Sequence, residues 1–210
     1  MPISKAATFL KSRITPWAPL WTTGRGFFAI AAVAAVLGLI SNYVVAPAYR
    51  EIAGFLPFDL QYPLSRFMIG VELGTFDGAT AIKAYVLFAA VHFALGIVVA
   101  ALFTLFWAWL FLKVPTRLFS FLRRGGILMV PWYVVPVDLL GKIGFFRLLG
   151  GLSWPPYDLT IELCAPINRF KFAMVDIRNY LTVAFVLVIV VGILLRRAAK
   201  PAPRDPSLPS

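Results

Sequence analysis

Four long apolar stretches divide the sequence: residues 27–45, 84–112, 126–150 and 179–195. A helix that crosses a bilayer needs about 20 predominantly apolar residues. The stretches do not alternate between polar and apolar positions as half-buried strands do. The pattern predicts an all-α, polytopic membrane protein with four transmembrane helices, all within one bundle that covers residues 27–196.

The segments between these stretches predict a smaller set of elements. Residues 46–80 and 151–178 are expected to form external loops, and prolines break the first of them into pieces. Short amphipathic interfacial helices are expected in PLSRFMIGVELGTF and in KVPTRLFSFLRRGG. From Ile167 onward no helix breaker occurs, so one long helix is expected whose first three turns stand outside the bilayer.

The distribution of basic residues gives an orientation. Residues 1–26, 113–125 and 196–210 together hold twelve Lys or Arg and one acidic residue, whereas the opposite side holds six basic and seven acidic residues. Because basic residues stay cytoplasmic, we expect both termini in the cytoplasm, with 1–26 a basic segment and 197–210 a disordered tail. The favoured location is the bacterial inner (plasma) membrane, and an organellar inner membrane remains an alternative.

The N-terminal segment allows three interpretations. It is a cytoplasmic tail, an organellar transit peptide, or the start of a secretory signal with Ala46-Pro47-Ala48 as its cleavage site. The apolar stretch that follows is longer than a signal usually has, which favours a retained first span. Within that span, Ala31/Ala35 and Ala34/Gly38 are either close-packing pairs of small residues or ordinary alanine filling.

Composition supports a membrane protein and argues against nucleic acid as a partner. Hydrophobic residues make up 60% of the chain, charged residues 14%, and the mean hydropathy is +0.85. A soluble domain usually has about a quarter charged residues. The net charge of +11 does not indicate nucleic acid, because the basic residues punctuate apolar stretches and do not form one basic face. The single cysteine, Cys164, permits no internal disulfide.

Ionisable residues inside the apolar stretches are the candidate site. Asp138 and Lys142 are four residues apart, so on a helix they share a face and can pair. Each alone near the bilayer centre would cost about 2.5–3.5 kcal/mol. Counted from the span ends, His92 lies at a similar depth. We therefore expect an intramembrane polar cluster of His92, Asp138 and Lys142, with Pro136 as a hinge beside it.

This cluster has two interpretations, a proton relay or substrate site, and an interhelical clasp that only fixes packing. Of the two, the clasp is favoured. The sequence contains no GxSxG, no HExxH, no phosphate-binding glycine loop and no Cys/His pair placed for nucleophilic catalysis, and His with Asp provides too few ligands for zinc. No cofactor and no metal are expected. Asp59 and the pair Asp158 and Glu162 are weaker candidates for a cation site, since external carboxylates are more often solvated or helix caps.

Four basic residues between the second and third stretches are expected to contact anionic lipid head groups on the inner leaflet: Lys113, Arg117, Arg123 and Arg124.

Short motifs resemble a group of small, uncharacterised bacterial four-helix integral membrane proteins. They are PFDLQYPLSRFMIGVEL, then PVDLLGK in the third stretch, and WPPYDL before the fourth, over residues 56–196. The resemblance implies the four-span topology and the importance of Asp59 and Asp138. This chain departs from the group at Gly141 and Lys142, where an acidic residue and Asn would be expected.

Two functions follow from these observations. The favoured one is a non-enzymatic accessory or interaction subunit of a membrane assembly, with a protein partner or a homo-oligomer. The alternative is a small proton-coupled carrier that uses His92, Asp138 and Lys142, although no internal repeat typical of transporters is present. A lipid-modifying enzyme comes third, because no nucleophile or metal site is evident.

Overall fold

The computed structural model describes residues 24–74, 78–113, 117–124, 126–151 and 157–198. All elements within these ranges are helical, and no strand occurs among them. Four helical stretches are long and apolar enough to cross a membrane: Gly26–Ala53, Thr80–Phe111, Ile127–Gly150 and Asp158–Leu195. The predicted all-α class with four such helices is confirmed. Most of the predicted N-terminal segment 1–26 and of the tail 197–210 lies outside the described residues.

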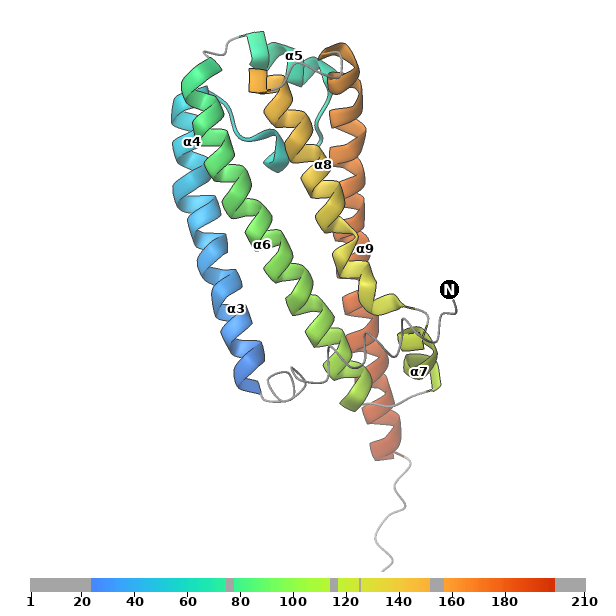
Figure 1. The fold of residues 1–210 in the computed structure, drawn as a ribbon. Coiled ribbons are helices and arrows are strands. Elements are labelled where there is room, and N and C mark those ends of the chain that lie inside the picture. Colours follow the sequence, from blue (N-terminus) through green and yellow to red (C-terminus); the bar gives the residue numbers. More distant parts are fainter. Residues whose placement is uncertain (1–23, 75–77, 114–116, 125, 152–156, 199–210) are drawn as a thin grey trace, which may run out of the picture.

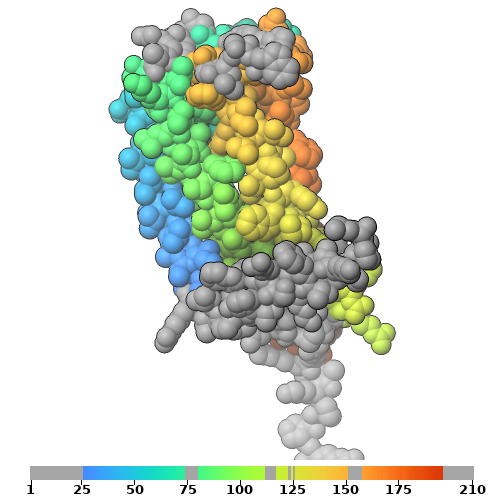
Figure 2. Space-filling view, in the orientation of Figure 1, coloured from blue at the N-terminus to red at the C-terminus, as the bar shows by residue number. Residues whose placement is uncertain are grey.

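The four long helices run up, down, up and down (Figure 1). The first packs mainly on the second, while the second, third and fourth pack on one another. Figure 2 shows the first three lying side by side on the viewed face, with the fourth at the right-hand edge. The fourth helix extends at its lower end beyond the first two (Figure 1).

The first helix is longer than predicted. It consists of α3 (Gly24–Leu39), a π-helical stretch η2 (Ile40–Val45) and α4 (Ala46–Ala53). We expected it to end at residue 45, before Pro47. The helix instead continues through Pro47, which directly follows the π-helical stretch, where the hydrogen-bond pattern of the helix changes. It ends at Gly54, whose φ of 81° is typical of a glycine C-cap.

Within the bundle, the small residues of α3 do not bring another helix into close contact. Ala34 and Gly38 lie on the side that faces α6, but a Cβ added at Gly38 would meet nothing within 4 Å, and Ala35 is exposed. The contacts inside the bundle therefore favour ordinary filling by alanine.

The connection to the second long helix folds back into the bundle. After α4 come the short 3₁₀ helix η3 (Phe58–Leu60) and α5 (Arg66–Gly74), and then α6 (Gly78–Lys113). The short helix expected in this connection is therefore present as α5, and its position at a membrane interface stays a prediction. Its exposed residues include Phe67 and Val71, and Arg66 forms an ion pair with Glu162.

The third stretch changes helix type around its prolines. It begins as the 3₁₀ helix η4 (Ile127–Trp132), continues as α8 (Val134–Phe146) and ends as the π-helical η5 (Arg147–Gly151). Pro136 lies in the first turn of α8, where its missing N–H breaks no helical hydrogen bond. The change of helix type comes immediately before it, at Tyr133. Whether Pro136 acts as a hinge stays a prediction.

The fourth helix, α9, runs without interruption from Tyr157 to Ala198. We predicted a helix from Ile167, so the helix begins about ten residues earlier than expected. Pro166 lies within it, on its exposed side. Thr160 and Cys164 before Pro166, and Asn168 and Lys171 after it, are buried against the rest of the bundle. These contacts hold the helix to the bundle on either side of the proline.

Two apolar clusters fill the bundle, one near each end. The first cluster is built around Tyr49, Phe58, Tyr85 and Phe145, all fully buried. The second cluster joins α6, α9 and the short helix α7 (Arg117–Arg124) through six buried residues: Trp107, Leu110, Phe111, Phe119, Phe185 and Ile189. Polar side chains occupy the space between the two clusters.

The helix α7 agrees with the predicted amphipathic turn. Its Phe119 stacks on Phe111 with ring centroids 4.9 Å apart, whereas Arg117 and Arg124 are exposed. Lys113 lies in α6 and Arg123 in α7, but their side chains lie outside the described part of the chain. Contact of these four residues with lipid head groups remains a prediction.

Candidate functional site: a buried cluster of four charges and the pocket beside it

The site begins with Asp59, which the loop after α4 carries into the bundle. Its neighbour Phe58 is fully buried between the rings of Phe55 and Phe145, with both centroid distances 5.1 Å. From α9, Asn168 donates a hydrogen bond of 2.9 Å to the carbonyl of Gln61. These contacts fix the loop and leave the Asp59 side chain 1% exposed.

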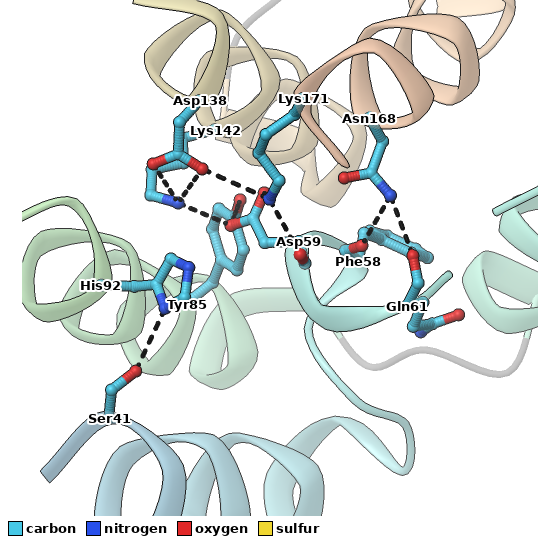
Figure 3. Close-up of polar contacts among 10 residues, drawn as sticks. All are labelled: Ser41, Phe58, Asp59, Gln61, Tyr85, His92, Asp138, Lys142, Asn168 and Lys171. Atoms are coloured by element: carbon cyan, nitrogen blue, oxygen red, sulfur yellow. Dashed lines mark hydrogen bonds and ion pairs between the residues drawn. The ribbon is translucent and has the colours of Figure 1, made fainter. Parts of the chain in front are cut away.

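Two helices supply the other charges. Asp138 and Lys142 lie one turn apart on α8, and Lys171 comes from the facing side of α9 (Figure 3). All are at most 6% exposed. We define the ion cluster as Asp59, Asp138, Lys142 and Lys171. It contains two carboxylates and two ammonium groups, so its formal charge is zero.

Each charged group of the ion cluster contacts both groups of opposite sign. Lys142 Nζ lies 3.1 Å from Asp59 Oδ2 and 3.0 Å from Asp138. Lys171 Nζ lies 3.3 Å from Asp138 Oδ1 and 4.0 Å from Asp59 Oδ1. It also donates a hydrogen bond of 2.8 Å to the Asp59 carbonyl. Buried charges are tolerated when they are paired and hydrogen-bonded in this way.

Neighbouring side chains complete the ion cluster. Tyr85 of α6 donates a hydrogen bond of 3.1 Å to Asp59 Oδ2, and the Lys142 ammonium lies 5.9 Å from the centre of the Phe88 ring. A Cβ added at Gly96 or Gly141 would lie 4.0 Å from an Asp138 or Asp59 oxygen, which is an ordinary contact distance, so both positions border the charges without a clash. Helix α6 thus encloses the charges that α8, α9 and the loop bring together.

The expected cluster is present only in part. The structure brings Asp138 and Lys142 together as the spacing predicted. His92 instead has its Nδ1 atom 3.2 Å from Ser41 Oγ, and its ring stacks on Phe88 at 5.2 Å (Figure 3). His92 was expected at the same depth as Asp138, but its ring contacts Ser41 of the first helix and makes no hydrogen bond with the ion cluster.

Asp59 and Lys171 were missed as members of the cluster. We expected Asp59 to be a solvated carboxylate or a cap, and Lys171 to stand outside the bilayer. A usable signal existed for α9: Asn168, Lys171 and Arg178 are spaced three and seven residues apart, on one helical face. For Asp59 the only signal was the motif PFDLQYP, because the other three members of the ion cluster are more than 70 residues away in the sequence.

Arg147, the other ionisable residue of the third stretch, lies apart from the ion cluster. It is buried at the end of α8 and donates a hydrogen bond of 2.8 Å from Nε to Thr160 of α9. This contact ties the upper ends of the third and fourth helices together.

A pocket of about 230 Å³ adjoins the ion cluster in the space between the two apolar clusters. Its polar lining residues are Asp59, His92, Asp138, Lys171 and Arg178, and the apolar ones come mainly from α6, α8 and α9. Arg178 lies over the Phe103 ring at 4.1 Å. Although His92 does not belong to the ion cluster, His92 and Asp138 line the same pocket.

Among the described residues, no group of three or more His, Cys, Asp or Glu is placed to hold a metal ion. Cys164 is free and buried. The polar side chains of the ion cluster are mostly engaged with one another. Comparisons with protein-family models, with curated proteins and with solved structures returned no match.

Proposed function

We propose that the chain is a multi-pass integral membrane protein that acts without catalysis, as an accessory or interaction subunit of a membrane assembly. Membrane insertion is supported by the exterior of the long helices, where large apolar side chains such as Phe28, Leu140 and Leu187 are more than half exposed. Soluble proteins rarely expose apolar surface on this scale. We therefore infer that lipid, and not water, surrounds this apolar surface.

The observation that carries the non-enzymatic part of the proposal is the closure of the ion cluster. Both carboxylates are engaged by both lysines, and the sum of charge is zero. A reaction centre keeps a nucleophile, base or metal open toward its substrate. Here the charges form a clasp that fixes the loop at Asp59 and the helices α8 and α9 in one arrangement.

A proton-coupled carrier is the second candidate, and the pocket is the observation that favours it. Asp138 and Lys171 line the pocket as well as the ion cluster, and ionisable side chains within spans often belong to transport pathways. The pocket is slightly smaller than most small-molecule sites, which measure about 300–1,000 Å³.

One preparation separates the two functions. The protein is purified in mild detergent from its native membrane and its mass is measured by native mass spectrometry, and the same preparation is reconstituted into liposomes that contain a pH-sensitive dye. The accessory function predicts a second polypeptide at fixed stoichiometry and no proton flux. A lone protein or homo-oligomer whose proton flux is lost in Asp138→Asn, but kept in the exposed variant Asp158→Asn, contradicts it and supports the carrier.

A further inference from the structure

We infer that the outward face of α9 is a docking surface for a transmembrane helix of a different protein, one that carries an acidic residue at the depth of Arg169 and a basic residue at the depth of Asp176. We call this surface the α9 strip and define it as Arg169, Ala173, Asp176 and Tyr180. The inference rests on the proposed function, because it takes α9 to be a membrane span and names the partner surface of an accessory subunit.

The α9 strip lies on the side of the helix that points away from the bundle. Its members follow one another at intervals of four, three and four residues, which keeps them on one helical face. The opposite face, with Asn168, Lys171 and Phe185, is buried. All four residues of the strip are exposed, and Tyr180 is 74% exposed.

Contacts across the bundle fix the depth of the strip. Asp176 lies along α9 between Lys171, which contacts Asp138, and Arg178, which covers the Phe103 ring. Asp138 is central in its candidate span, eleven residues from Ile127 and twelve from Gly150. Phe103 lies eight residues, or about 12 Å, from the end of its own span at Phe111. Asp176 is therefore deep within the layer that the four helices would span.

The outward side chains of neighbouring helices at comparable depth are apolar, for example Ile97 of α6 and Leu139 of α8. Within the described part of the chain, neither Arg169 nor Asp176 takes part in an ion pair. A long arginine side chain can extend toward the head groups, but an aspartate is too short to do so from this depth. Charged residues in spans face a partner or a cavity in nearly all cases.

The order of the two charges selects the partner. Copies of one membrane protein insert with the same orientation, and a twofold axis along the membrane normal would bring Arg169 against Arg169 and Asp176 against Asp176. Like charges would then meet at both depths, so a second copy is a poor occupant. A different helix with the opposite order of charges satisfies both residues. Ala173, between them, permits close approach of the two backbones.

The test uses probe helices of defined orientation in the membrane of cells that express the full chain. Each probe is a single leucine-rich span with a basic cytoplasmic flank, which fixes its direction. The matched probe carries Glu at the Arg169 depth and Lys at the Asp176 depth, and the reversed probe has the same composition with these two residues exchanged. A cysteine midway on each probe can form a disulfide with Ala173→Cys in a Cys164→Ala background.

The matched probe should crosslink about tenfold more than the reversed probe, since two interhelical polar contacts of ordinary strength together give roughly that ratio. The preference should vanish in the double variant Arg169→Gln/Asp176→Asn. Equal yields for the two probes, or a dominant Ala173→Cys homodimer, would overturn the inference while leaving membrane insertion intact. Loss of the protein from the carbonate-resistant membrane fraction would instead overturn the proposed function itself.

Discussion

Asp59 is the residue on which the site depends most. It enters the bundle from a loop, and its side chain and carbonyl together receive contacts from Tyr85, Lys142 and Lys171. Local spacing was enough to predict the pairing of Asp138 with Lys142, because one helix sets that distance. The positions of Asp59 and Lys171 depend on how distant segments pack, and no periodicity along the chain encodes that.

Removing one member of the ion cluster should lower the free energy of unfolding more than removing an oppositely charged pair does. Asp59→Asn keeps an acceptor for Tyr85 but leaves two ammonium groups for one buried carboxylate. We expect a loss of about 3–5 kcal/mol in the free energy of unfolding, measured by SDS titration in mixed micelles. Adding Lys171→Met should recover part of that loss.

The matched control is Asp158→Asn, at an exposed position of α9, which should change the free energy of unfolding by about 0.5 kcal/mol or less. Strictly additive losses for Asp59→Asn and Lys171→Met would show that the two groups are not coupled.

Glu72 on α5 gives a pH dependence outside the spans. Burial raises the pKa of its carboxyl above the ordinary value of 4.5, and the hydrogen bond donated by Gln61 opposes this shift. Between the two pKa values the unfolded chain binds fewer protons than the folded protein, so stability falls as the pH rises from 4.5 through the folded pKa.

Glu72→Gln, which keeps an acceptor for Gln61, should therefore melt at a higher temperature than the wild type at pH 8 and at nearly the same temperature at pH 4. The exposed substitution Glu51→Gln is the control. A variant that gains as much at pH 4 as at pH 8 would mean that ionisation of Glu72 is not the cause.

At the scale of elements, the sequence pattern predicted the number and order of the long helices better than their ends. The apolar stretches alone account for α3, α6 and the lower half of α9. Pro47 was predicted to be a break, and the last helix was predicted to begin only after Pro166. Both prolines instead lie within long helices, and tertiary contacts hold α9 to the bundle around Pro166. Proline predicts a boundary only when no packing compensates for the lost hydrogen bond.

The approach of α8 to α9 depends on Gly144. A Cβ added there would lie 2.6 Å from Cys164 Sγ, so Gly144→Ala should cost about 1–3 kcal/mol of stability. Cys164→Ala in the same chain removes the clashing sulfur and should restore most of the loss. Gly70→Ala on α5, where a Cβ would meet nothing within 4 Å, serves as the control in thermal melts. If the double variant melts no higher than Gly144→Ala, another contact limits this interface.

At the scale of the whole molecule, the ion cluster lies between the two apolar clusters, and apolar side chains cover the outside of the bundle. Burying four charges in this way gives little net stability over an apolar core. It does favour one register of α8 against α9 and one position of the loop. An accessory subunit needs such a fixed shape, and the α9 strip would then present its two charges at a constant depth.

Accessibility of single cysteines to a membrane-impermeant maleimide tests the four-span arrangement most directly. In a Cys164→Ala background, Ser65→Cys should react in intact cells, whereas Ser4→Cys, Ser120→Cys and Ser207→Cys should react only after the membrane is permeabilised. Reaction of Ser4→Cys and Ser207→Cys from opposite sides, or of Ser65→Cys only after permeabilisation, would contradict the account.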